Sequence, residues 1–207
     1  MPYGGDSMKI FDKHFFLGLG VGIIITIILE IAAFFIFIAV MNWLHPYETR
    51  MAARLEPPPL SDHFSETAAA EYDWMVKSLD GTDFPIAEAK GKTVFLNFWA
   101  TWCLPCRIEM PGIQKLYEHL KEKGIVFICI SDEENKIVSA FIRKKKYTFP
   151  VYTMKGAPPQ IYKTEGIPAT FIISPEGKVV LKHVGSAKWD YPTVSEFILG
   201  LKSQNTP

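Results

Sequence analysis

The chain has few of the residues that several common functions need. Its 207 residues include only three cysteines and five histidines, and 22 lysines and arginines are balanced by 22 aspartates and glutamates. A net charge of zero, with no basic arm, argues against nucleic acid binding. A zinc site needs two further ligands beside a Cys-x-x-Cys pair, and the scattered histidines do not supply them. We therefore expect no nucleic acid partner, no metal and no cofactor.

One long segment carries almost no charge. From Phe15 to Leu44 the chain has no lysine, arginine or aspartate and a single glutamate, Glu30. A helix of that length spans about 45 Å, enough to cross the hydrocarbon core and both headgroup layers. A cleavable signal peptide has a shorter apolar region followed by a small-x-small cleavage site, which residues 41–46 lack. The sequence predicts an uncleaved transmembrane helix over residues 15–44, after an N-terminal segment over residues 1–14. Two lysines precede the span and two arginines follow it, so the charges do not decide its orientation.

Two features inside this span have alternative interpretations. Gly18 and Gly22 form a small-xxx-small pair that allows another helix to approach closely, although glycine is common in membrane helices. Glu30 is ionisable near mid-span, where such a group faces a partner or stays protonated. We predict that Gly18, Gly22 and Glu30 contact a partner protein within the bilayer; the alternative for Glu30 is a protonated side chain tolerated by lipid.

The rest of the chain divides into a tether, a domain and a short tail. Residues 45–71 contain three consecutive prolines, which favour stiff polyproline II and predict a tether that holds the domain off the bilayer. Residues 72–203 alternate between strand and helix patterns, which predicts an α/β domain with a mixed central sheet flanked by helices. The expected strands are 74–79, 93–99, 125–131, 169–173 and 179–184, and the expected helices are 106–123, 135–146 and 194–201. Residues 204–207 form the tail.

The chemistry concentrates at one junction between a strand and a helix. Cys103 and Cys106 follow the buried strand 93–99, at the expected start of a helix. Exposed N–H groups and the positive end of the helix dipole stabilise a thiolate there, which lowers the pKa of the first cysteine. Two intervening residues let the second cysteine resolve a mixed disulfide. Cys129 lies inside a buried strand, so we expect an inert core thiol.

Two motifs carry a family resemblance. Residues 97–111 read NFWATWCLPCRIEMP and residues 166–171 read GIPATF. Together they resemble the membrane-anchored thioredoxin-like family typified by the TlpA, ResA and CcmG proteins, over residues 72–201. The resemblance implies the thioredoxin-like fold and thiol–disulfide exchange on the periplasmic or extracytoplasmic side of a bacterial cytoplasmic membrane, which makes residues 1–14 a cytoplasmic segment. It also implies a protein disulfide as substrate, a membrane thiol as electron donor, and a role in cytochrome c maturation or oxidase metal-site assembly.

The resemblance also assigns roles to individual residues. Cys103 would be the attacking thiolate and Cys106 the resolving thiol, and the two would form a redox-active disulfide. Ile167-Pro168 would be a cis bond that offers backbone to a substrate strand, the alternative being a trans turn. The residues expected to shape the substrate surface are Trp102, Leu104, Pro105 and Ile167.

Glu109 is the candidate proton relay. Thioredoxins proper place a buried aspartate at the position of Asn97 to move a proton to or from the resolving thiol, and an amide cannot titrate. Glu109 follows Cys106 by three residues, near the same helix face, and the resemblance associates this glutamate with the active site. The alternative is a solvated glutamate favoured by the helix dipole.

Three functions are compatible with the sequence of the whole chain. Pro105 supplies no N–H to either sulfur, and fewer groups around a thiolate make the reduced form less stable and the potential more negative. We therefore predict a membrane-tethered protein-disulfide reductase. An oxidant or isomerase is the second enzyme hypothesis. The third is an accessory subunit of a larger membrane complex, held by its transmembrane helix and with secondary redox activity.

Overall fold

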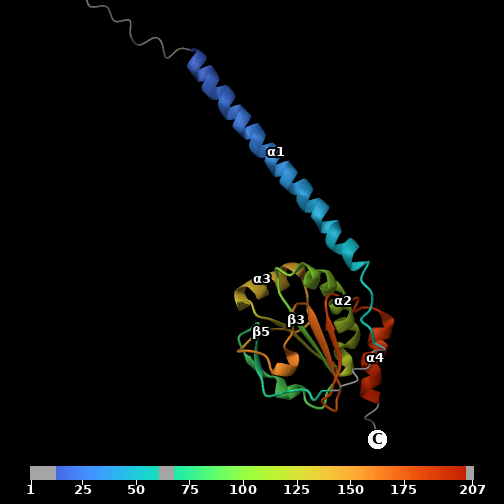
Figure 1. Ribbon diagram of the computed structural model, residues 1–207. Helices are drawn as coiled ribbons and strands as arrows, with labels where there is room; N and C mark the ends of the chain where they lie inside the picture. Colours follow the sequence, from blue (N-terminus) through green and yellow to red (C-terminus); the bar gives the residue numbers. More distant parts are fainter. Residues whose placement is uncertain (1–12, 61–67, 204–207) are drawn as a thin grey trace, which may run out of the picture. The chain divides into compact units, whose positions relative to one another are not determined.

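A computed structural model describes residues 13–60 and 68–203 (Figure 1). The chain divides into two compact units, Met1–Tyr47 and Glu48–Pro207. The described residues of the first unit belong to one long helix, and the second contains the sheet with its helices.

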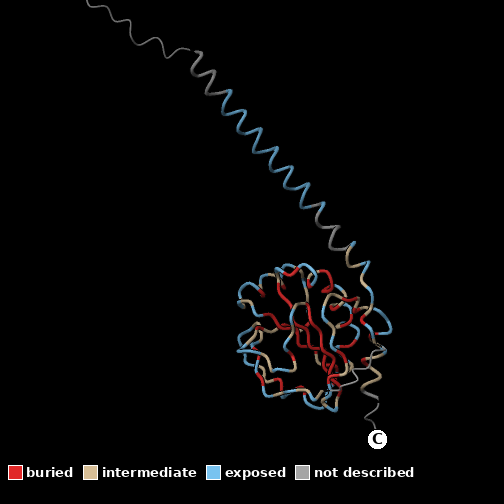
Figure 2. Tube along the Cα trace, viewed as in Figure 1, coloured by how far each residue is buried: buried red, intermediate tan, exposed pale blue. Residues whose placement is uncertain are grey.

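Helix α1 runs from Lys13 to Ala52, further than the expected span of residues 15–44. Its segment Val21–Met41 is long and apolar enough to cross a membrane, with a mean hydropathy of 3.0, and none of it is buried within the structure. Figure 2 shows this stretch as exposed along its length. The helix continues past residue 44 because glutamate, arginine, methionine and alanine, which follow there, favour helix. The first part of the expected tether is therefore helical.

The second unit is built on a seven-stranded sheet in the order β2-β1-β5-β4-β3-β6-β7. Strands β3, β4 and β5 pair in parallel, and the other neighbouring pairs are antiparallel. The strands are β1 Met75–Ser78, β2 Asp83–Pro85, β3 Val94–Trp99, β4 Val126–Ser131, β5 Val151–Met154, β6 Ala169–Ile173 and β7 Val179–Val184. The helices are α2 Leu104–Leu120, α3 Asn135–Lys145 and α4 Pro192–Ser203, with 3₁₀ turns at Ile86–Ala89, Lys121–Lys123 and Gln160–Tyr162.

The handedness of the connections determines which face the helices cover. The crossovers from β3 to β4 and from β4 to β5 run in the same direction along the sheet, so right-handed connections put α2 and α3 on one face. Leu116 of α2, Val138 of α3 and Ile198 of α4 accordingly belong to one buried cluster with Phe95 and Trp99 of β3. The opposite face packs against a second cluster, which includes the 3₁₀ residues Ile86 and Tyr162. Strand β3 is therefore buried on both faces.

The expected α/β fold is confirmed, with two strands that the sequence pattern did not predict. Strand β2 is only three residues long and ends in a proline, and β5 has only four residues. Neither is long enough to show the alternation by which a strand is recognised. The expected helix 106–123 begins earlier, at Leu104, and its last residues form a separate 3₁₀ turn.

The described residues at 56–60 and 68–71 of the expected tether contact the domain, and the role of the tether as a spacer stays a prediction. The N–H of Lys188 donates to the carbonyl oxygen of Glu56 at 2.8 Å. Pro58 is buried, and Leu60 packs against the helix-side core cluster. Further on, the carbonyl oxygen of Ala68 accepts from Val179 N–H at 3.0 Å. A proline ring is apolar, so this proline run docks on the protein surface as well as stiffening the chain.

Candidate active site

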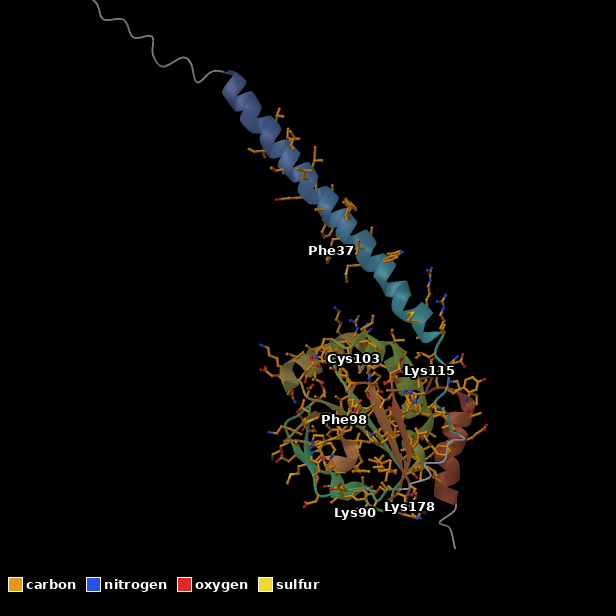
Figure 3. The ribbon with its side chains drawn as sticks, viewed as in Figure 1. Phe37, Lys90, Phe98, Cys103, Lys115 and Lys178 are labelled. Atoms are coloured by element: carbon orange, nitrogen blue, oxygen red, sulfur yellow. A yellow bond between two sulfur atoms is a disulfide. The ribbon has the colours of Figure 1, made fainter. Side chains whose placement is uncertain are left out.

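The two cysteines of the motif form a disulfide at the start of α2. The Cα atoms of Cys103 and Cys106 are 5.3 Å apart. Cys103 is the N-cap of α2, and its Sγ accepts a hydrogen bond from Cys106 N–H at 3.2 Å. Cys103 keeps 4% of its surface exposed and Cys106 none, so the first sulfur is the more accessible one. Figure 3 labels Cys103 and, on the preceding strand β3, Phe98 within the same domain.

The second motif lies against the first. The Ile167-Pro168 peptide bond is cis, as the resemblance implied. The carbonyl oxygen of Ile167 is 3.7 Å from Cys103 Sγ, although 64 residues separate them in the chain. Pro168 is buried, and its carbonyl oxygen accepts from Gly185 N–H at 2.8 Å. The backbone before β6 is therefore in place beside the disulfide.

An apolar rim surrounds the disulfide. Trp102 is 69% exposed and Leu104 is 38% exposed, and both flank Cys103 in the chain. Pro105 is also exposed, whereas Ile167 is half-buried. Exposed apolar groups beside a reactive sulfur are suited to contact with another protein. Their role in substrate binding stays a prediction.

Glu109 is buried, and the alternative of a solvated glutamate is wrong. Its side chain is 1% exposed, one helical turn beyond Cys106. Its Oε1 accepts from Asn97 Nδ2 at 3.1 Å, and its Oε2 accepts from Ala187 N–H at 3.1 Å and from Trp189 Nε1 at 2.8 Å. Burial raises the pKa of Glu109 to about 8, although the three hydrogen bonds lower it. The carboxyl group can thus exchange a proton near neutral pH.

Asn97 orients this carboxyl group. Its Nδ2 donates both to Glu109 and, at 2.9 Å, to Thr170 Oγ1 on β6. The sheet register places Cys129, Asn97, Thr170 and His183 directly beside one another on four adjacent strands. Asn97, at the position where thioredoxins proper have an aspartate, therefore lies within a row under α2 and holds the carboxyl group of Glu109 by a hydrogen bond.

Several residues of the site carried no signal in the sequence. Ala187 and Trp189 follow β7 in an irregular loop, and no motif marks them as partners of Glu109. Glu133 accepts hydrogen bonds from both the N–H and the Oγ1 of Thr101, each at 2.6 Å, and so holds the turn before Cys103. The one sequence signal for Glu133 was its position just after a buried strand, at the same edge of the sheet as the start of α2.

Cys129 is separate from the redox pair. It is buried and free of disulfide bonds, and burial raises the pKa of its thiol, with a smaller contribution from the charge of Glu109. This agrees with the expected core thiol. Among residues 13–60 and 68–203, no three histidine, cysteine, aspartate or glutamate side chains gather where they could hold a metal ion.

The predicted contacts within the membrane concern α1 alone. Glu30 is exposed on the helix, and a Cβ at Gly22 would meet no atom within 4 Å. Gly18 lies in α1, but its surroundings are outside the described part. These three residues therefore stay a prediction about a partner.

The fold and the site define a thioredoxin-like domain with a Cys-x-x-Cys disulfide at a helix N-terminus. The family model described as AhpC/TSA family matches residues 67–182, and the chain belongs to that family. Thiol-disulfide oxidoreductase ResA of a Bacillus cereus strain is 40% identical over 115 residues, which cover 55% of this chain and 66% of that protein. ResA of Bacillus subtilis (strain 168) is 37% identical over 112 residues, 52% of this chain and 62% of that protein.

Solved structures agree with this assignment. A thioredoxin-family thiol:disulfide interchange protein from Chlorobium tepidum TLS has a TM-score of 0.56 and 29% identity, covering 66% of this chain and 99% of that chain. StoA from Bacillus subtilis has a TM-score of 0.51 and 26% identity, covering 60% of this chain and 94% of that one. The resemblance drawn from the two motifs is confirmed. The chain spans slightly less than two thirds of the length of the first curated relatives it matches.

Proposed function

We propose that this protein is a membrane-tethered thiol–disulfide oxidoreductase that reduces protein disulfides outside the cytoplasm. The observation that carries the proposal is the Cys103–Cys106 pair at the N-terminus of α2, beside the Ile167 carbonyl and one turn from a buried, titratable Glu109. Relatives named thiol-disulfide oxidoreductase support it. A free-standing structural disulfide would need neither the adjacent backbone acceptor nor the buried carboxyl group.

The reaction is a two-electron exchange. In the reduced protein, the Cys103 thiolate attacks one sulfur of the substrate disulfide, forms a mixed disulfide and releases the other substrate sulfur as a thiolate. The Cys106 thiolate then attacks Cys103 Sγ, which forms the intramolecular disulfide and releases the second substrate thiolate. The substrate gains two electrons and takes up two protons, and the protein pair is oxidised. A membrane dithiol carrier, itself oxidised to a disulfide, restores the reduced pair.

Glu109 accepts and returns the proton of the resolving cysteine, Cys106. Cys106 is completely buried, so its thiol cannot lose a proton directly to bulk water. Glu109 lies one helical turn away, and its raised pKa makes it a base of suitable strength near neutral pH. In this proposal Glu109 accepts the proton as Cys106 attacks, and returns it when the pair is reduced again.

The apolar rim and the apolar helix point to the substrate and the location. Exposed Trp102, Leu104 and Pro105 would contact the polypeptide around the substrate disulfide, with Ile167 supplying backbone. Helix α1 would span the bilayer and leave the domain on the periplasmic or extracytoplasmic side. By resemblance, the pathway is cytochrome c maturation or oxidase metal-site assembly.

The reduction potential of the Cys103–Cys106 pair tests the direction of transfer. We expect the full-length protein in detergent, equilibrated with defined thiol and disulfide buffers, to have a potential below about −200 mV, closer to thioredoxin at about −270 mV. Pro105 provides no N–H that would stabilise the thiolate. A value near about −120 mV, typical of a strong oxidant, would instead select the oxidant or isomerase hypothesis.

The accessory-subunit hypothesis has one specific observation in its favour, the exposed Glu30 on an apolar helix. If Glu30 bonds to a polar group of another membrane protein, Glu30→Leu is expected to remove most of that association after gentle extraction. Native mass spectrometry of the extracted protein measures the associated mass. Ile28→Leu is the control on the same helix. A complex that survives Glu30→Leu unchanged would refute this role.

A further inference from the structure

The loop after β7 joins three parts of the site. Gly185 N–H donates to the carbonyl oxygen of Pro168 at 2.8 Å. Ala187 N–H and Trp189 Nε1 both donate to Glu109 Oε2, at 3.1 and 2.8 Å. Lys188 N–H donates to another partner, the carbonyl oxygen of Glu56, at 2.8 Å. Five consecutive residues, 185–189, which we call the hub loop, thus bond to the backbone before β6, to the buried glutamate and to the segment that follows α1.

The hub loop is held tightly on its α2 side. Trp189 is completely buried, and its ring meets that of Phe95 edge to face at 5.1 Å. A Cβ at Gly112 of α2 would lie 3.4 Å from Trp189 N, so helix and loop are in close contact. Lys115 Nζ and Asp190 Oδ2, 3.0 Å apart, form an ion pair just beyond the loop. Gly185 has a φ of +108°, a conformation that other residues rarely adopt.

The segment after α1 contacts the other side of the hub loop. It consists of residues 56–60, in which Pro58 is buried and Leu60 packs against the same core cluster as Ala187 and Trp189. Only residues 53–55 separate the docked segment from the end of α1 at Ala52. The membrane-proximal end of the chain is therefore connected to the hub loop by a very short link.

We propose that residues 56–60 are a positioning element for the redox site: by holding the hub loop, they keep Glu109 covered and the Pro168 backbone in place. This inference rests on the proposed function. It assigns a role in exchange to a segment that lies outside both cysteine-site motifs in the sequence. It also couples the membrane anchor to the proton relay, because displacement of the segment loosens the loop that covers Glu109.

The charged and titratable groups around Glu109 limit what else could change its protonation. Cys103 and Cys106 precede it on α2, Cys129 lies on β4, and His183 of β7 packs its ring against Trp189 at 5.9 Å. None of these belongs to residues 56–60. The hydrogen bond from Lys188 N–H to the Glu56 carbonyl oxygen joins the segment to the hub loop, and through this loop a change in the segment alters the burial or the hydrogen bonds of Glu109.

Leu60→Ala in the full-length protein, in detergent, tests the inference. The readout is the pH midpoint of the exchange rate with a small disulfide such as oxidised glutathione, which needs no protein–protein contact. Loosening the hub loop admits water to Glu109, and burial is the main cause of its raised pKa. We expect the midpoint to fall by about half a pH unit or more. Leu60→Met, which keeps a side chain of similar volume, should keep the wild-type midpoint, and Ile137→Ala, at an exposed apolar side chain of α3 outside the segment, should leave it unchanged.

The Glu109→Gln background separates this inference from the proposed function. If Glu109→Gln removes the midpoint, the relay exists, and Leu60→Ala should then have no further effect on the pH profile in that background. An unmoved or raised midpoint in Leu60→Ala alone, with wild-type thermal unfolding, would overturn the positioning role and leave the relay intact. If Glu109→Gln itself leaves the profile unmoved, the relay fails and this inference fails with it. If Leu60→Ala does not fold, the pH midpoint of Pro58→Ala is compared with that of the wild type in the same way, and the same outcomes support or overturn the positioning role.

Discussion

Cys103→Ser is expected to abolish reduction of protein disulfides, by about 10³-fold or more, because a serine hydroxyl is not ionised at neutral pH and cannot replace the attacking thiolate. Cys103 is the more accessible of the pair and the N-cap of α2, where Cys106 N–H reaches its sulfur. The measurement is the rate at which the reduced full-length protein reduces a disulfide-containing polypeptide such as insulin.

Cys106→Ser should behave differently from Cys103→Ser. It retains the attacking thiolate but lacks the resolving one, so we expect a mixed disulfide with the substrate to accumulate and turnover to stop. Mass spectrometry under non-reducing conditions detects the adduct and locates it on Cys103. The chain supplies its own control, since Cys129→Ala removes a buried thiol outside the pair and should leave the rate unchanged. An adduct on Cys106, or equal activity in the Cys103→Ser protein, would reverse or remove the assigned roles.

Glu109→Gln should change how the stability of the oxidised domain depends on pH. Burial raises the pKa of Glu109 to about 8 from a reference value of 4.5, so the folded state binds this proton more tightly than the unfolded state. The stabilisation is complete below the unfolded pKa and is lost as pH rises through the folded one. Between about pH 4.5 and 8 the free energy of unfolding should therefore fall, by on the order of a few kcal/mol.

The glutamine variant should lose this slope and be more stable than the wild type above pH 8. An amide can keep the hydrogen bonds from Ala187 and Trp189 if the amide of Asn97 turns its oxygen toward it. Denaturant unfolding at a series of pH values, followed by tryptophan fluorescence, measures the effect. Glu118→Gln, at an exposed position of the same helix, is the matched control. A slope that persists in Glu109→Gln would mean that another group titrates.

The same variant should flatten the pH profile of exchange. With no titrating group beside it, Cys106 loses its proton acceptor, and the second step slows most where Glu109 would be ionised. Rapid mixing of reduced protein with substrate separates the two steps, because the first depends on Cys103 alone. A second step of normal rate and pH dependence would contradict the relay.

The cysteine pair, its partner motif and the apolar helix were all evident in the amino-acid sequence, because each is encoded locally. The positions of Cys103 and Cys106 between a buried strand and a helix fix their chemistry, and the apolar run needs only length and composition to be recognised. The GIPATF motif identified Pro168 by resemblance, and the structure places its neighbour Ile167 beside Cys103 Sγ.

Only the tertiary structure shows the environment of Glu109 and the surface against which the proline segment packs. The periodicity of α2 gives the side on which Glu109 lies, but its burial depends on Trp189, which is 80 residues further along the chain. A sequence pattern likewise describes the stiffness of residues 57–59, but not the surface against which Pro58 packs. Periodicity reports the faces of one element, whereas a pKa depends on everything packed around the group. The position of the redox cysteines was therefore predictable from the sequence, whereas the packing that buries Glu109 and raises its pKa was not.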